Sequence, residues 1–138
     1  MKIILVVEDD AKIAGALRIR LEAAGYTVVT AADGFSGLKM AMMHKPSLIL
    51  LDIMMPVGMG FSVAERLKDL GLGDIPIIFI TASKRAGLRT TARQLGAAGF
   101  FEKPYDAEEL IAAVDLILGR PPVPGSPAAS GSRARSAP

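Results

Sequence analysis

Five short apolar runs occur at regular intervals along this chain, and each is followed by a stretch with helical periodicity. The predicted strands span 2–7, 26–31, 47–52, 76–81 and 98–102, and the predicted helices span 11–24, 35–44, 61–70, 84–95 and 106–118. Alternation of this kind implies a parallel sheet, because parallel neighbours are joined through crossover helices. We therefore predict an α/β fold, a five-stranded parallel sheet with helices on both of its faces.

Local signals support the ends of two predicted helices. Asp10 stands at the N-cap of the first helix, and Gly25 stands where that helix is expected to end. Asp106 opens the last helix in an acidic variant of the capping box.

Polar residues stand where four of the apolar runs end. Asp52 closes the third run, Glu8 and Asp9 follow the first, Thr81 closes the fourth and Lys103 follows the fifth. The carboxyl ends of parallel strands share one edge of the sheet, where ligands and chemistry collect. A carboxylate at the end of a buried strand is costly unless something binds it. Acids, a hydroxyl and a lysine at one edge predict a metal-assisted phosphate site.

The three acids of this set are expected to hold a metal ion. Glu8, Asp9 and Asp52 would repel one another, and a hard divalent cation relieves that repulsion. Mg²⁺ prefers oxygen ligands and often binds through one or two carboxylates plus a phosphate, so we expect Mg²⁺ here, with Mn²⁺ as a substitute. The alternative is that such acids only cap helices, and we prefer this interpretation for Asp10 but not for the other three acids.

Thr81 and Lys103 would supply the phosphate-binding side of the site. A threonine hydroxyl can donate to a phosphoryl oxygen, and a lysine neutralises its charge. Either residue alone would be unremarkable, and their joint occurrence with the acids at strand ends carries the prediction. Pro104 allows a cis peptide after Lys103, although trans is the base-rate expectation.

These motifs resemble those of the receiver domains of bacterial two-component response regulators. The resemblance runs from about Lys2 to Leu118, and it rests on four motifs in order: Ile4-Leu5-Val6-Val7-Glu8-Asp9-Asp10, Leu51-Asp52-Ile53-Met54-Met55-Pro56 with Gly60, Thr81-Ala82, and Lys103-Pro104. It implies a flavodoxin-like doubly wound (βα)5 fold with strand order 2-1-3-4-5.

The resemblance also implies chemistry for the site. Asp52 would accept a phosphoryl group from a histidine kinase or a phosphotransfer protein, which would make the chain a signalling switch and no turnover enzyme. Glu8 and Asp9 would hold magnesium together with Asp52 and the Met54 carbonyl. Thr81 and Lys103 would bind the acyl phosphate.

A conformational response is implied as well. Thr81 would move toward the phosphate and Phe100 would turn inward. The face made by 84–95, 98–102 and 106–118 would then bind a downstream protein or a second copy of the chain. Arg85, Arg89 and Arg93 would form a basic stripe there, which we interpret as a solvated helix face in preference to a docking site for an acidic partner.

Some positions depart from the commonest receiver pattern. Met59 stands where many receivers have an acid, and 96–100 lacks the paired acids often found before the switch aromatic. These absences weaken assignment to one large transcription-factor subfamily. Phe100 has no hydroxyl, so its inward form cannot donate the hydrogen bond that a tyrosine could.

Two other functions are found on α/β sheets with polar residues at strand ends. Phosphatases and mutases of the haloacid-dehalogenase type place a second acid two residues after the nucleophile, but Met54 is two residues after Asp52. Flavin- or dinucleotide-binding modules place a glycine-rich turn after the first strand, where this chain has acids that would repel a pyrophosphate. Both alternatives are therefore weak.

The chain is expected to comprise a receiver domain over 1–119 and a disordered Pro-, Ala-, Ser- and Gly-rich tail or linker over 120–138. That tail could be a natural end, a connection to a DNA-binding or other output domain, or an artificial cut. We favour a single-domain protein, with the N-terminal receiver of a larger regulator as the alternative.

The charge balance gives no support for nucleic-acid binding. Through Gly119 there are 13 Lys and Arg against 14 Asp and Glu, and the net positive charge comes from Arg120, Arg133 and Arg135. There are no cysteines, which excludes thiolate chemistry and Cys-based zinc sites. No apolar run approaches the ~20 residues of a membrane span, and acids end the first run, so we expect a cytoplasmic protein without membrane contact.

Overall fold

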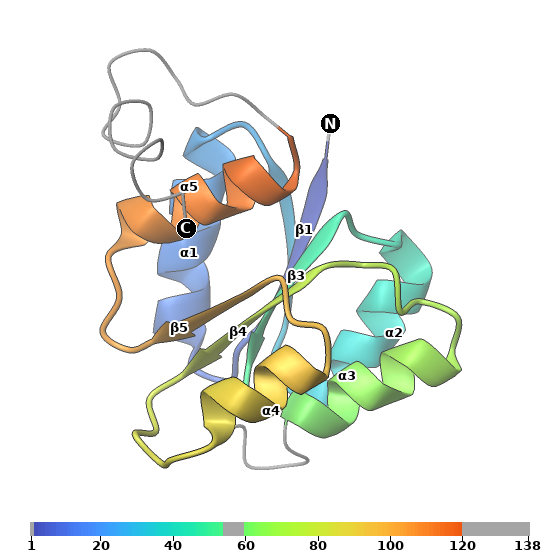
Figure 1. Ribbon diagram of the computed structural model, residues 1–138. Helices are drawn as coiled ribbons and strands as arrows, with labels where there is room; N and C mark the ends of the chain where they lie inside the picture. Colours follow the sequence, from blue (N-terminus) through green and yellow to red (C-terminus); the bar gives the residue numbers. More distant parts are fainter. Residues whose placement is uncertain (1, 54–59, 120–138) are drawn as a thin grey trace.

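The computed structural model describes residues 2–53 and 60–119, and the elements alternate as the sequence predicts (Figure 1). The strands are β1 (Ile3–Val7), β2 (Thr27–Ala31), β3 (Leu48–Asp52), β4 (Ile77–Thr81) and β5 (Gly99–Glu102). The helices are α1 (Ala11–Ala23), α2 (Gly34–His44), α3 (Gly60–Asp69), α4 (Leu88–Gln94) and α5 (Ala107–Ile117). Met54, Met59 and the predicted tail 120–138 lie outside the described residues.

The strands form one parallel sheet in the order β2-β1-β3-β4-β5, which confirms the predicted fold and strand order. β3 is the middle strand, and all five of its residues are buried. A central strand covered on both faces reads as an unbroken apolar run, which explains the sequence Leu-Ile-Leu-Leu before Asp52.

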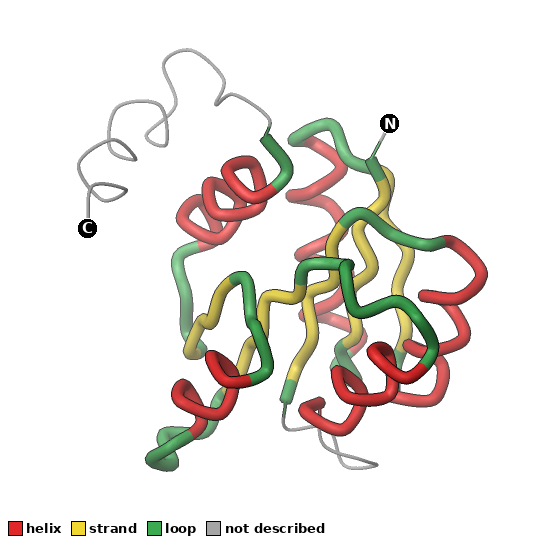
Figure 2. Tube along the Cα trace, turned by 45° about the vertical axis from the view of Figure 1, so that its right-hand side comes forward, coloured by secondary structure: helices red, strands yellow, loops and turns green. Residues whose placement is uncertain are grey.

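Two apolar clusters lie on opposite faces of the sheet, because successive strand residues point to opposite sides. The first cluster joins Ile4, Val6 and Leu50 to residues of α1 and α5. The second joins Leu5 and Leu51 to residues of α2, α3 and α4. Figures 1 and 2 show this arrangement of layers, with α1 and α5 on one side of the sheet and the other three helices across it. In the described residues, no helix is both long and apolar enough to cross a membrane.

Most helix ends agree with the sequence signals. The Asp10 side chain accepts hydrogen bonds from the backbone N–H groups of Lys12 and Ile13 at the start of α1. Asp106 accepts from the N–H of Glu108 and caps α5 in the same way. Gly25 follows the C-cap of α1 with a positive φ of 101°, the left-handed conformation that glycine tolerates best.

The predicted start of the fourth helix at residue 84 is wrong. The N–H of Ser83 donates to Thr81 Oγ1 at 3.0 Å, and the N–H of Arg85 donates to Ser83 Oγ at 3.1 Å. Such side-chain acceptors offer the backbone an alternative to helical hydrogen bonds, so this segment forms a loop. α4 begins only at Leu88, and Arg85 therefore lies outside the helix that carries Arg89 and Arg93.

Candidate functional site

The polar residues that end the apolar runs meet at the carboxyl edge of the sheet. Asp52 is the last residue of β3 and Thr81 the last of β4, while Glu8 directly follows β1 and Lys103 directly follows β5. β1 and β4 flank β3 in the sheet, so their carboxyl ends lie on either side of Asp52. The topology thus gathers residues that are up to 95 positions apart in the chain.

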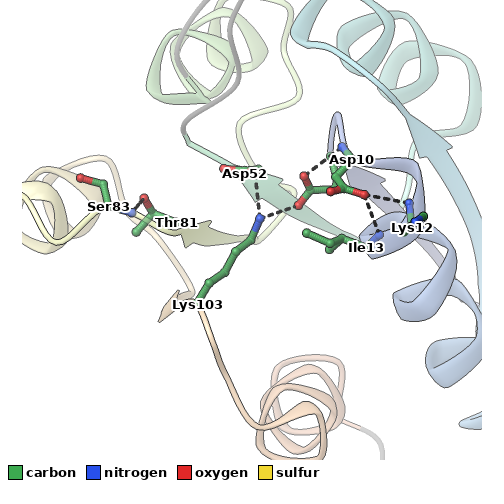
Figure 3. Close-up of polar contacts among 8 residues, drawn as sticks. Asp10, Lys12, Ile13, Asp52, Thr81, Ser83 and Lys103 are labelled. Atoms are coloured by element: carbon green, nitrogen blue, oxygen red, sulfur yellow. Dashed lines mark hydrogen bonds and ion pairs between the residues drawn. The ribbon is translucent and has the colours of Figure 1, made fainter.

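Lys103 joins two buried carboxylates. Its Nζ lies 2.9 Å from Glu8 Oε1 and 3.1 Å from Asp52 Oδ2. Figure 3 shows the Lys103 side chain extending toward Asp52. Glu8 and Asp52 are only 5% and 6% exposed, whereas the Lys103 ammonium reaches them from β5, the edge strand. The peptide bond between Lys103 and Pro104 is cis, against the base-rate expectation.

Burial and neighbouring charged groups shift the pKa values of Glu8 and Lys103. Burial raises the pKa of Glu8 above its ordinary value, and the Asp52 charge adds to this, although hydrogen bonds from Lys103 and from the Asp10 N–H act in the opposite direction. Burial alone would lower the pKa of Lys103, but hydrogen bonds to Glu8 and Asp52 and their negative charges raise it overall. Lys103 is thereby kept as a cation.

The three acids expected to hold a metal are brought together. Glu8, Asp9 and Asp52 each offer a carboxylate oxygen, and these oxygens lie within 4.8 Å of one another. Asp9 is exposed and the other two acids are buried, which leaves the cluster open on one side. An all-oxygen donor set with excess negative charge and an open side suits Mg²⁺, which retains water ligands. Asp10 instead caps α1, which agrees with its interpretation as a helix-capping residue.

Thr81 is fully buried, and its hydroxyl is engaged within its own loop. Thr81 Oγ1 accepts the hydrogen bond from the Ser83 N–H, and Figure 3 shows this pair to one side of the contacts that join Lys103 to the acids. In this structure Thr81 therefore lies at the predicted edge of the sheet while its hydroxyl faces Ser83.

Gly60 has a structural role at the site that the sequence motif alone does not explain. A Cβ on Gly60 would lie 2.9 Å from the Asp52 carbonyl oxygen and 2.9 Å from Ile53 Cα. The Gly60 N–H donates to the Ile53 carbonyl at 3.0 Å, so α3 begins in direct contact with the end of β3. Any side chain would push this backbone away from Asp52.

Phe100 lies in β5, three residues before Lys103, and is partly buried. It packs against the second apolar cluster and is the register partner of Phe79 in the sheet. The Arg89 guanidinium lies 4.7 Å from the centroid of the Phe100 ring. This contact could not be predicted from the sequence, from which we interpret Arg89 as part of a solvated helix face.

Comparison with known proteins gives a family match over most of the chain. The model of the response regulator receiver domain matches residues 4–115. Over 118 residues the chain is 39% identical to the DNA-binding dual master transcriptional regulator RpaA of Synechocystis sp., an alignment that covers 85% of this chain and 49% of that protein. Over 119 residues it is 40% identical to the alkaline phosphatase synthesis transcriptional regulatory protein PhoP of Bacillus subtilis, covering 86% and 49%.

The chain thus spans about half the length of the curated relatives it matches. Among solved structures, the chemotaxis protein CheY4 of Vibrio cholerae superposes with a TM-score of 0.79 at 29% identity, covering 85% of this chain and 98% of that one. The receiver domain of the Francisella response regulator 1452 superposes with a TM-score of 0.80 at 26% identity, covering 86% and 98%.

Proposed function

Because this chain belongs to the response regulator receiver family, we propose that it is a signalling switch whose phosphoryl acceptor is Asp52. The observation that carries the proposal is the cluster of three carboxylates within 4.8 Å, with Lys103 Nζ bound to one oxygen of Asp52. A buried nucleophilic carboxylate beside a cation is the arrangement that formation of an aspartyl phosphate requires.

In the proposed reaction an Asp52 carboxylate oxygen attacks the phosphorus of a phosphohistidine on a histidine kinase or phosphotransfer protein. The new O–P bond forms as the P–N bond breaks, and the departing imidazole keeps the bonding electron pair and takes up a proton. Lys103 is already 3.1 Å from Asp52 Oδ2, so its charge is in place to neutralise a phosphoryl oxygen. The remaining contribution of the site is positioning, since the donor brings an activated phosphoryl group.

Glu8, Asp9 and Asp52 would hold the divalent cation, with the Met54 carbonyl as the further ligand expected from the sequence. When bound, Mg²⁺ would neutralise the charge that gathers on the phosphoryl oxygens. Among the described residues this cluster offers carboxylate oxygens, a donor type that fits Mg²⁺ and also Mn²⁺.

The output of the switch would be a shift between two packings of the face formed by α4, β5 and α5. Thr81 would exchange its contact with Ser83 for a contact with the phosphoryl group, and Phe100 would change its orientation under α4. A downstream protein or a second copy of the chain would read that face. The 1–119 receiver boundary and the cytoplasmic location expected from the sequence belong to this proposal.

The alternative arrangement, in which this receiver serves a larger regulator, is supported by its relatives. RpaA and PhoP are named as transcriptional regulators and are about twice as long as the matched region. In that arrangement DNA binding would belong to an output domain, and the described residues would supply the phosphorylation-dependent control. The chemistry at Asp52 is the same in both arrangements.

Intact-mass spectrometry after incubation with acetyl phosphate and Mg²⁺ tests the proposal. The wild type is expected to gain the mass of one phosphoryl group, and the gain should disappear without the metal and in Asp52→Asn. Asp69→Asn is the matched control, because it makes the same chemical change at an exposed acid at the end of α3. Labelling that persists in Asp52→Asn would overturn the assignment of the acceptor.

A further inference from the structure

Two cations on the α4 side of the molecule each contact a side chain of β5. Arg89 in α4 places its guanidinium 4.7 Å from the centroid of the Phe100 ring. Lys84, in the loop before α4, places its Nζ 3.3 Å from Glu102 Oε1. Phe100 and Glu102 are two residues apart on one strand, so both project from the same face of the sheet. The loop and the helix that follow Thr81 are thereby tied to neighbouring positions of β5.

The two contacts differ in strength. Lys84 and Glu102 form an ion pair whose side chains are 68% and 43% exposed, and exposed pairs of this kind contribute little. Phe100 is partly buried against the second apolar cluster, and an arginine over an aromatic face combines cation–π attraction with stacking of its planar group. Arg89 therefore makes the more informative contact.

The sequence around Arg89 leaves the ring as its favourable neighbour. Arg93, one turn along α4, and Arg85, in the loop before the helix, carry the same charge as Arg89, and the segment 83–98 contains no acid. A like charge at the i+4 position of a helix is unfavourable, so Arg93 does not attract the Arg89 side chain. Because the segment 83–98 contains no acid, no carboxylate in it competes for the guanidinium. The π-face of Phe100 is the favourable contact that the structure shows for the Arg89 guanidinium.

Resting on the proposed function, we propose that Arg89 is a positioning residue that holds Phe100 in the observed orientation and so opposes the switch. A contact present in one of two packings shifts their equilibrium by its own free energy. Reorientation of Phe100 separates the ring from the guanidinium. The Lys84–Glu102 pair is a second, weaker tie on the loop that holds Thr81 against Ser83. Loss of the Arg89 contact therefore makes the phosphorylated packing easier to reach.

The test compares Arg89→Met with Arg93→Met, which removes the same charge from an exposed position one turn along α4. Beryllofluoride with Mg²⁺ serves as the phosphate mimic, and its apparent Kd is measured by NMR on protein with labelled phenylalanine rings. Arg89→Met is expected to bind the mimic about 2- to 5-fold more tightly than the wild type, the factor that a partly exposed cation–π contact supplies. Arg93→Met should leave the affinity unchanged, and Arg89→Lys should restore part of the wild-type value.

A second readout needs neither metal nor mimic. The ring signals of Phe100, assigned with Phe100→Leu, should shift in Arg89→Met and remain in place in Arg93→Met. Unchanged ring signals, or an Arg93→Met protein that gains as much affinity as Arg89→Met, would overturn the inference. If the wild type is phosphorylated at Asp52 but Arg89→Met binds beryllofluoride with wild-type affinity, the role of Arg89 is refuted and the proposed function is not. A wild type that takes up neither phosphoryl group nor mimic refutes the proposed function, and the role of Arg89 with it.

Discussion

Asp52 and Asp115 are both buried carboxyl groups, but they lie toward opposite ends of the sheet strands and have different kinds of neighbours. Asp52, 6% exposed, ends β3 at the carboxyl edge, where Glu8, Asp9 and Lys103 surround it. Asp115, 9% exposed, lies in α5 and accepts a hydrogen bond from the hydroxyl of Tyr26, which immediately precedes β2. The first group lies among other charges, and the second has a neutral partner.

The difference distinguishes a site from a structural contact. At the carboxyl edge three carboxylates lie together and Lys103 pairs with two of them, so the cluster offers negative charge that a further cation can neutralise. At the other end the Tyr26 hydroxyl donates to Asp115 and ties α5 to the segment that leads into β2. Burial alone therefore does not mark a functional acid in this fold, whereas uncompensated neighbouring charge does.

The largest effect is expected from removal of the cation at the carboxyl edge. Lys103→Met would leave Glu8 and Asp52 buried without their shared partner, and the metal-free protein should lose about 3 kcal/mol of unfolding free energy. Urea unfolding followed by circular dichroism measures it. Lys84→Met, which breaks an exposed pair, is the control and should cost less than about 1 kcal/mol. Equal losses in the two variants would contradict the comparison.

Removal of the structural acid should destabilise the fold without altering the site. Asp115→Ala would leave the buried Tyr26 hydroxyl without this acceptor, at a cost of about 1–3 kcal/mol in the same unfolding experiment. Acetyl phosphate labelling and its dependence on Mg²⁺ should remain as in the wild type. Altered labelling in a folded Asp115→Ala protein would mean that the two ends are coupled.

Mg²⁺ should stabilise the folded protein through the carboxylate cluster at the carboxyl edge of the sheet, and this gain should not depend on Asp115. At a free concentration ten times its Kd, Mg²⁺ is expected to add about 1.4 kcal/mol to the stability of the wild type. The gain should vanish in Asp9→Asn, which removes an exposed member of the cluster, and persist in Asp115→Asn. Thermal unfolding with and without the ion reads the difference, and a gain retained in Asp9→Asn would place the ion elsewhere.

The smallest effect concerns the protonation of Glu8. Burial raises the pKa of Glu8 in the folded protein, so the unfolded chain loses this proton first as the pH rises. Metal-free stability should therefore fall as the pH rises from the ordinary value of 4.5 through the raised pKa, and Glu8→Gln should remove that fall. The melting temperature of Glu8→Gln relative to wild type should be higher at neutral pH than in acid. A difference independent of pH would show that Glu8 is not the titrating group.

Most of the fold could be predicted from the chain, because its patterns are local. Apolar runs and helical periodicity located every helix and strand. Asp10 and Asp106 marked two helix starts, because each accepts hydrogen bonds from N–H groups only two or three residues later in the sequence. The start of α4 was misplaced because Thr81 and Ser83 draw the following N–H groups into a loop. That competition depends on side-chain geometry that a pattern of residue types does not carry.

The residues that make up the site could be predicted from the sequence, but the contacts between their side chains could not. Parallel strands bring their carboxyl ends to one edge, so the order of the strands alone gathers Glu8, Asp52 and Lys103. The direction of each side chain is a different matter, since it follows from packing between segments that are distant in sequence. The contact of Arg89 with Phe100 could not be predicted for that reason, although both residues had been singled out.

By itself the sequence determined the alternation of strands and helices, the parallel sheet, and the placement of acids, threonine and lysine at strand ends, because each depends on neighbouring residues or on topology. Only the tertiary structure decided which charges touch. It joined Lys103 to acids 95 and 51 positions away, and Tyr26 to Asp115 across 89 positions. Contacts over such separations form only when the folded core fixes both backbones, so they are properties of the packing and no stretch of sequence contains them.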